Sequence, residues 1–133
     1  MSDTDLTTDD LALIDEPHLG FVATVMADGT PQITPVWVDR DGGDLRFNTA
    51  RGRVKTNNLE RDPNVAVLVI DERDPYRWVS IRGTAELIDD GADAHIDALA
   101  TKYTGADSFK GRTPEQRRVT VKVTSTHRPV RYH

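Results

Sequence analysis

The sequence predicts a mainly β protein of the α+β class, an antiparallel β-barrel of about six strands with helices at its ends. Short runs rich in Val, Thr and Phe recur along the chain, and Gly-containing turns separate the first of them. Two or three other stretches carry the signals of helices. The chain has 133 residues and shows no linker or internal repeat, so residues 1–133 are expected to form one domain.

The chain opens with a short helix inside residues 1–17. Thr7 and Asp10 have the spacing of a capping box, in which each side chain bonds a free backbone N–H at the helix start. Pro17 ends the helix, because the residue before a proline disfavours helical geometry.

A three-stranded antiparallel meander is predicted next. Its first strand covers residues 19–26, and its second covers residues 31–39. The Asp28-Gly29 pair between them favours a two-residue hairpin turn. A second turn at residues 41–44 leads to a third strand at residues 45–49.

A polar helix is predicted over residues 53–61, and Asp62-Pro63 ends it. The fourth strand follows at residues 65–70, which are all apolar and show no alternation. A strand that is apolar on both faces is buried on both faces. Because a small barrel covers only one face with its core, we expect the other face to meet a second subunit.

The first five barrel strands lie within residues 19–87. The fifth covers residues 77–87, where apolar and polar residues alternate. Gly83 inside this strand indicates a bulge or a close backbone approach. A second long helix is predicted over residues 89–104, with Gly105 as its left-handed cap. The final strand lies within residues 118–128, where valines alternate.

Composition narrows the classes of function. The net charge of −5 disfavours binding to nucleic acid through bulk charge. No apolar run suits a transmembrane helix, and the acidic N-terminus is unlike a secretory signal, so no membrane partner is expected. Cysteine is absent, which excludes disulfides and thiolate metal sites and fits a cytoplasmic protein.

The densest positive charge lies at Arg51, Arg53 and Lys55, between a strand that ends at residues 48–50 and a helix. A helix N-terminus offers free N–H groups and a partial positive charge, so added cations there favour an anion, phosphate above all. A solvated basic loop is the alternative interpretation. Lys102, on the second long helix, is expected to do almost nothing for binding.

Two tryptophans and a proline mark other candidate surfaces. Trp78 lies on the polar face of its strand, where a large ring is usually covered by a partner subunit or a ligand. Ordinary packing is the alternative for Trp78 and for Trp37, the only other tryptophan. Pro35 inside a strand indicates an edge or a bulge whose neighbours expose backbone groups to a heterocycle.

The sequence shows no conventional catalytic or metal-binding set. No serine has the context of a nucleophile. The histidines lack metal-ligand spacing, and surface or core roles are expected for His18, His95, His127 and His133. If the chain is an enzyme, its reactive group is therefore expected to be a cofactor.

Three segments resemble a known family. They are FVATVMADGTPQITPVWVD from Phe21, LRFNTARGRVKTNNLERDPNVAVLVID from Leu45, and RWVSIRGTAELI from Arg77. They resemble the pyridoxamine-phosphate-oxidase-like split β-barrel proteins, and within these the small F420-dependent subgroup. The resemblance covers residues 20–103, and its most specific part runs from Thr49 to Pro63.

This resemblance implies a split β-barrel of the FMN-binding type and a homodimer with two cofactor sites at the subunit interface. The implied phosphate ligands are Arg53 and Lys55, assisted by Asn48 or Thr49 and by Asn58. The charge cluster itself adds Arg51 to this expected anchor. The implied ring-side strand carries Gln32, Pro35, Val36 and Trp37. Ile70, Arg77 and Trp78 are implied to approach from the fourth and fifth strands, either within one subunit or across the dimer. The tail from His127 to His133 departs from the family pattern, so the resemblance implies no substrate residue there.

The resemblance implies an oxidoreductase that transfers a hydride between F420 and a small organic acceptor. One alternative is an FMN-binding or flavin-reductase-like protein on the same barrel. A second alternative is a cofactor-binding carrier of F420 without turnover of its own. A nucleic-acid binder fits poorly, because no basic stripe interleaved with aromatics is present.

Overall fold

The structure is a computed structural model that describes residues 2–132. Met1 and His133, for which a surface or core role is expected, lie outside the described residues. Within the described residues, eight strands and three helices follow one another. Their bounds are α1 (Thr8–Asp15), β1 (Gly20–Val25), β2 (Pro31–Val36), β3 (Val38–Asp41), β4 (Asp44–Ala50), α2 (Val54–Arg61), β5 (Asn64–Ile70), β6 (Trp78–Ile88), α3 (Ala92–Thr104), β7 (Arg118–Ser125) and β8 (Val130–Arg131).

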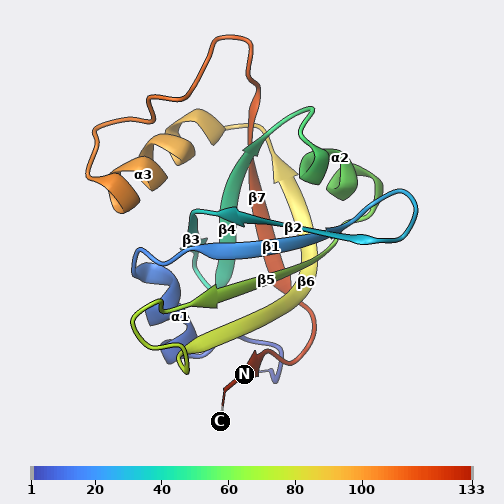
Figure 1. Cartoon of the computed structure of the whole chain (residues 1–133), viewed down its shortest axis with the longest axis vertical. Helices are drawn as coiled ribbons and strands as arrows, with labels where there is room; N and C mark the ends of the chain where they lie inside the picture. The colour runs from blue at the N-terminus through green and yellow to red at the C-terminus, as the bar shows by residue number, and fades with distance from the viewer. Residues whose placement is uncertain (1, 133) are drawn as a thin grey trace.

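All strand pairs are antiparallel, and the strands form one curled sheet in the order β2-β1-β5-β6-β7-β4-β3, with β8 paired to β6. The two strands at opposite ends of this order, β2 and β3, are joined by Trp37 alone. The chain therefore links the two ends of the sheet, and the sheet curls into a barrel (Figure 1).

The predicted single strand over residues 31–39 is wrong, and so is the three-stranded meander built on it. β2 pairs with β1, whereas β3 pairs with β4. At the break, the backbone N–H of Val38 donates to the Tyr103 hydroxyl at 3.0 Å. A side chain from α3 thus takes the bond that a continuing ladder would have made, and the chain turns the barrel corner at Trp37.

The two predicted turns have different outcomes. The first hairpin has a three-residue loop, because Met26 N–H donates to the Thr30 carbonyl at 2.8 Å and Gly29 N–H donates back to Met26. Gly29 has a φ of +87°, as the last residue of such a loop requires. The second turn is as predicted, with Gly42 and Gly43 between the paired Asp41 and Asp44.

The core fills the barrel with side chains from alternate positions of its strands. β5 buries Val65, Val67 and Val69, while Ala66 and the other residues of its second face stay partly exposed. Only one apolar face of β5 is therefore covered by this chain. The largest fully buried side chains include Phe47, Ile14, Leu45, Ile81, Leu99, Val22, Val67, Val79 and Val121.

Gly83 is a point of close backbone approach, as its place in the sequence predicted. A Cβ built on Gly83 would lie 1.8 Å from the Thr124 carbonyl oxygen of β7. No side chain fits there, because the opposing atom belongs to the backbone and cannot rotate away.

The helices flank the sheet. α1 lies toward the end that holds both chain termini, and α2 and α3 lie toward the opposite end (Figure 1). The capping box of Thr7 and Asp10 is present in α1, and Gly105 ends α3 with a φ of +78°. α3 packs mainly on β7. Among residues 2–132, no helix is long and apolar enough to cross a membrane.

Two predicted bounds at the C-terminal side change. α3 begins at Ala92, three residues later than predicted, after the left-handed Gly91. β7 ends at Ser125, and the tail turns back so that Val130–Arg131 forms β8 against β6. The tail is held there by an ion pair between Arg131 and the buried Asp10.

Candidate functional site

A cavity of about 300 Å³ lies at the barrel corner, beside the break between β2 and β3. α2, α3, β4, β7 and two loop residues complete its walls, so seven separate stretches of sequence converge on it. It brings together six of the predicted site residues, Pro35, Val36, Trp37, Asn48, Arg53 and Lys55, and adds Leu19, Ile96, Leu99, Phe109 and Arg118.

Three cations line this cavity: Arg53 and Lys55 at the start of α2, and Arg118 at the start of β7. Within residues 2–132, none of the three forms an ion pair with a carboxylate. Burial lowers the pKa of Lys55, and repulsion by Arg53 and Arg118 lowers it further. Three cations that repel one another without a counter-ion favour a bound anion.

Arg118 was not among the sequence-predicted residues. It is 6% exposed, its Nε donates to Asn48 Oδ1 at 2.9 Å, and its guanidinium lies 5.4 Å from the centre of the Phe109 ring. The sequence held one weak signal, since alternation with Val119 turns residue 118 away from the core. Its approach to Arg53 depends on the pairing of β7 with β4, which local sequence does not specify.

Two aromatic side chains, Trp37 and Phe109, also line the cavity, and Tyr103 supports Trp37. The Trp37 ring stacks on Tyr103, with centroids 5.4 Å apart and planes 12° apart, and Phe109 meets Trp37 edge-on at 6.1 Å. The Tyr103 hydroxyl donates to the His18 carbonyl at 2.6 Å. Burial raises the pKa of Tyr103 to about 12, so this phenol stays neutral and holds the wall in place.

Three predicted phosphate ligands lie outside the cavity and have structural partners. Arg51 donates to Asp89 at 3.0 and 3.1 Å and to Glu60 at 2.8 Å. Its charge is therefore neutralised within the chain, and its role at the phosphate stays a prediction.

Thr49 and Asn58 are buried supports of α2. The Thr49 hydroxyl accepts a bond from Thr56 at 3.3 Å. The Asn58 amide donates to the Thr24 hydroxyl at 2.9 Å, which ties α2 to β1. Neither residue lines the cavity.

Gln32 lies on β2, two strand positions before Thr34. Gln32 Oε1 and Thr34 Oγ1 are buried, and within residues 2–132 neither has a hydrogen-bond partner. Gln32 is absent from the cavity lining, whereas Pro35 and Val36 on the same strand belong to it. The predicted ring-side strand is thus only partly brought to the cavity.

Ile70 and Trp78 line a different hollow, of about 480 Å³, on the outer side of β5 and β6. The residues around it are mainly apolar, and Leu68 and Pro75 are among them. The chain by itself therefore does not bring these two predicted residues to the cationic cavity.

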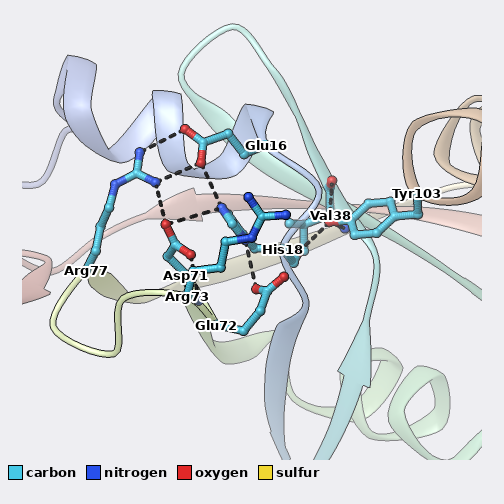
Figure 2. Close-up of polar contacts among 8 residues, drawn as sticks. All are labelled: Glu16, His18, Val38, Asp71, Glu72, Arg73, Arg77 and Tyr103. Carbon is cyan, nitrogen blue, oxygen red and sulfur yellow. Dashed lines mark hydrogen bonds and ion pairs between the residues drawn. The ribbon is translucent and has the colours of Figure 1, made fainter.

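Arg77 is also held apart from the cavity, by a cluster at the end of α1 (Figure 2). It donates to Glu16 at 2.7 and 3.0 Å and to Asp71 at 3.1 Å. His18 bonds Glu16 and Glu72, each at 2.8 Å. Its Arg77 partner, and then His18, lower the pKa of Glu16 to about 2. Although Glu16, His18 and Asp71 lie close enough to share a cation, the Arg77 guanidinium already supplies the positive charge.

Lys102 is not the neutral position that was expected. Its Nζ donates to the carbonyls of Ile14 and Val38, at 2.5 and 2.6 Å. Val38 directly follows Trp37, so removal of this lysine would disturb the cavity wall. Lys122, which lies four residues after Arg118 on β7 and forms ion pairs with Asp41 and Asp44, is a better control.

The chain is similar to proteins of a known family. A family model described as pyridoxamine 5'-phosphate oxidase matches residues 6–128. The F420H(2)-dependent biliverdin reductase of Mycobacterium tuberculosis (strain CDC 1551 / Oshkosh) is 32% identical over 122 residues, which cover 90% of this chain and 84% of that protein.

Solved structures share the fold of this chain. One named F420 Reductase is 33% identical, with a TM-score of 0.80 over 94% of this chain and 98% of its own. A conserved hypothetical protein from Mycobacterium tuberculosis is 24% identical, with a TM-score of 0.73 over 96% of this chain and 85% of its own, a likeness of fold alone. The predicted split-barrel fold is confirmed.

Proposed function

Because this chain belongs to the pyridoxamine 5'-phosphate oxidase family, we propose that it binds the deazaflavin F420 and transfers a hydride between that cofactor and a small organic acceptor. The observation that carries the proposal is the convergence of Arg53, Lys55 and Arg118 in one cavity without acidic partners. F420 joins a tricyclic ring to a phosphodiester and an acidic tail. Its anionic part needs a cationic site of this kind.

The residues present fit such a cofactor. Arg53 and Lys55 lie at the start of α2, whose N-terminal arginine makes no side-chain cap bond, so both cations can meet a phosphate oxygen. Arg118 presents a fixed guanidinium, because Asn48 holds its Nε. Burial, and then repulsion by Arg53 and Arg118, lowers the pKa of half-buried Lys55, so an anion bound there would stabilise its charged form.

The ring chemistry belongs to the cofactor, which supplies the hydride when bound. The role of the protein is to hold and orient the ring of the cofactor. Trp37 offers a flat wall that Tyr103 keeps rigid from behind, and Pro35 on the edge strand leaves backbone groups unpaired on one side. These groups would orient a heterocycle and shield it from water.

A second copy of the chain would complete the site. The cavity of about 300 Å³ is at the low end of the range for ligand pockets, and its aromatic wall covers one side only. The outer face of β5 and β6 leaves Leu68, Ile70 and Trp78 partly exposed, and Ile33 on β2 is 65% exposed. We expect a homodimer in which this apolar face is covered, with an interface on the order of 2,000 Å². Light scattering that reports a monomer at micromolar concentration would contradict it.

The cofactor is tested by titration of the protein with F420 and with FMN. Trp37 forms the cavity wall, so its fluorescence should fall as either ligand fills the cavity. We expect F420 to bind more tightly than FMN. Tighter binding of FMN, or protein that is purified with bound FMN, would assign the chain to the FMN-dependent branch instead.

One observation favours a second candidate function, a carrier of F420 without turnover. Among the residues that line the cavity, none is a carboxylate or a histidine that could exchange a proton with an acceptor. Incubation of the protein with reduced F420 and a panel of small organic acceptors separates the two. Enzymatic oxidation of the cofactor above the uncatalysed rate supports the reductase, and tight binding without it supports the carrier.

A further inference from the structure

A chain of buried hydrogen bonds leads away from the cationic cavity into the space between α3 and the sheet. Arg118 Nε donates to Asn48 Oδ1 at 2.9 Å, and Asn48 Nδ2 lies 3.2 Å from His95 Nδ1. On its other side, His95 Nε2 lies 3.0 Å from Asp39 Oδ1. The links come from β7, β4, α3 and β3 in turn.

We infer that His95 is a positioning residue for Arg118 and acts through the amide of Asn48. His95, Asn48 and Arg118 are each less than 9% exposed, so solvent cannot replace a bond that is lost among them. The ligand side of this inference rests on the proposed function, whereas the hydrogen-bond geometry does not depend on it.

Asp39, at the far end of this series of hydrogen bonds, determines which nitrogen of His95 carries a proton. Asp39 is a carboxylate that accepts two bonds from Arg46, at 2.8 and 3.0 Å. Burial raises the pKa of Asp39, but the bonds from His95 and Arg46 outweigh burial and lower it overall. An ionised carboxylate only accepts, so His95 Nε2 carries the proton and donates. In the neutral ring, His95 Nδ1 is therefore an acceptor.

That acceptor and the Ala92 carbonyl together set the orientation of Asn48. The Asn48 amide nitrogen meets two acceptors, the Ala92 carbonyl at 2.9 Å and His95 Nδ1. The Thr120 hydroxyl lies 2.9 Å from the same Nδ1, so it and the Asn48 amide share the single lone pair of that nitrogen. With its nitrogen directed at these acceptors, Asn48 can only present its oxygen to Arg118 Nε. A flipped amide would set two N–H donors against the guanidinium and release it.

The first test needs no ligand. In the wild-type protein, Arg118 Nε–H should give a distinct 15N–1H NMR signal protected from solvent exchange, because it is buried and bonded to Asn48. His95→Phe keeps a ring of similar size and removes both nitrogens, and we expect that protection to fall at least tenfold.

Two further variants separate hydrogen bonding from packing. His95→Asn places an oxygen near the position of Nδ1 and loses the reach to Asp39, so it should retain the protection of Arg118 to within about threefold. His95→Gln can reach Asp39 and offers no acceptor near the Nδ1 position, so it should behave like His95→Phe. A ring that merely fills space gives the reverse order, with Phe tolerated and Asn harmful.

The second test measures anion affinity with inorganic pyrophosphate, by calorimetry. His95→Phe should weaken binding about three- to tenfold, the range for loss of one neutral hydrogen bond. In an Arg118→Met background the same substitution should change nothing, because His95 then has no guanidinium to position. Lys122→Ala, which removes a charge that Asp41 and Asp44 already neutralise outside the cavity lining, should leave the affinity unchanged.

The outcomes distinguish this inference from the proposed function. If His95→Phe leaves the Arg118 signal protected, or if His95→Asn behaves like His95→Phe, the positioning role is refuted whatever cofactor binds. Should His95→Phe fail to fold, the Asn and Gln pair decides alone. If the NMR and pyrophosphate results hold but neither F420 nor FMN binds, the positioning role stands and the proposed function fails.

Discussion

Substitution of Lys55 by alanine probes the anion site at its most sensitive point. Lys55 has no carboxylate partner among the described residues, and burial together with Arg53 and Arg118 lowers its pKa. Its whole charge is therefore available to a phosphate. A hydrogen bond to a charged group contributes about 1.5–3 kcal/mol, so Lys55→Ala should weaken cofactor binding roughly ten- to a hundredfold.

The same substitution should leave the free energy of unfolding of the free protein undiminished. A folded-state pKa below the normal value means that folding penalises the charged ammonium, and alanine removes this penalty. Loss of affinity without loss of stability is thus the expected pair of results. An ordinary structural lysine would give loss of both.

The assay is a fluorescence titration with F420, run beside urea unfolding of the same preparation. Lys122→Ala is the matched control, since it also removes one lysine charge and lies outside the cavity lining. The reasoning is refuted if Lys55→Ala binds F420 as the wild type does, or if Lys122→Ala weakens binding equally.

Further predictions concern pH and packing. Anion binding should raise the lowered pKa of Lys55, so cofactor affinity should fall as the pH rises through the pKa of the free protein; titrations between pH 7 and pH 10 check this. Burial lowers the pKa of His18 but its bonds to Glu16 and Glu72 more than offset this, so the pKa rises above 6.5. The stability that His18 adds should therefore be complete below about pH 6.5 and be lost as the pH rises through its folded-state pKa, which an NMR titration and His18→Gln unfolding at pH 6 and pH 9 would show. Gly83→Ala should cost about 3 kcal/mol or more, because its Cβ would meet the Thr124 carbonyl, and Gly43→Ala, which meets nothing within 4 Å, should cost about 0.5 kcal/mol or less.

Local signals in the sequence were enough for most of the elements. The capping box at Thr7, the alternation around Gly83 and the cap at Gly105 each depend on neighbours within a few residues, and each appears as predicted. The break at Trp37 depends on Tyr103, which lies 66 residues further along the chain and takes the bond of Val38. Periodicity within residues 31–39 carries no trace of that partner.

Some residues of the candidate site could be predicted from local sequence, and others depend on the tertiary fold. Arg53 and Lys55 could be found because a helix start beside clustered cations is a local pattern. Arg51 carries the same charge in the same segment, yet Asp89 and Glu60 neutralise it from other elements. Arg118 reaches the cavity only through the pairing of β7 with β4. Which cations stay free is a property of the tertiary fold.

The central claim is that the anionic part of F420 binds among Arg53, Lys55 and Arg118. A crystal structure of the protein grown with F420 tests it most directly. The account predicts phosphate oxygens within hydrogen-bond distance of Lys55 Nζ and the Arg118 guanidinium, with the ring against Trp37. A cofactor whose phosphate lies outside this cavity, with Lys55 and Arg118 untouched, would contradict the account.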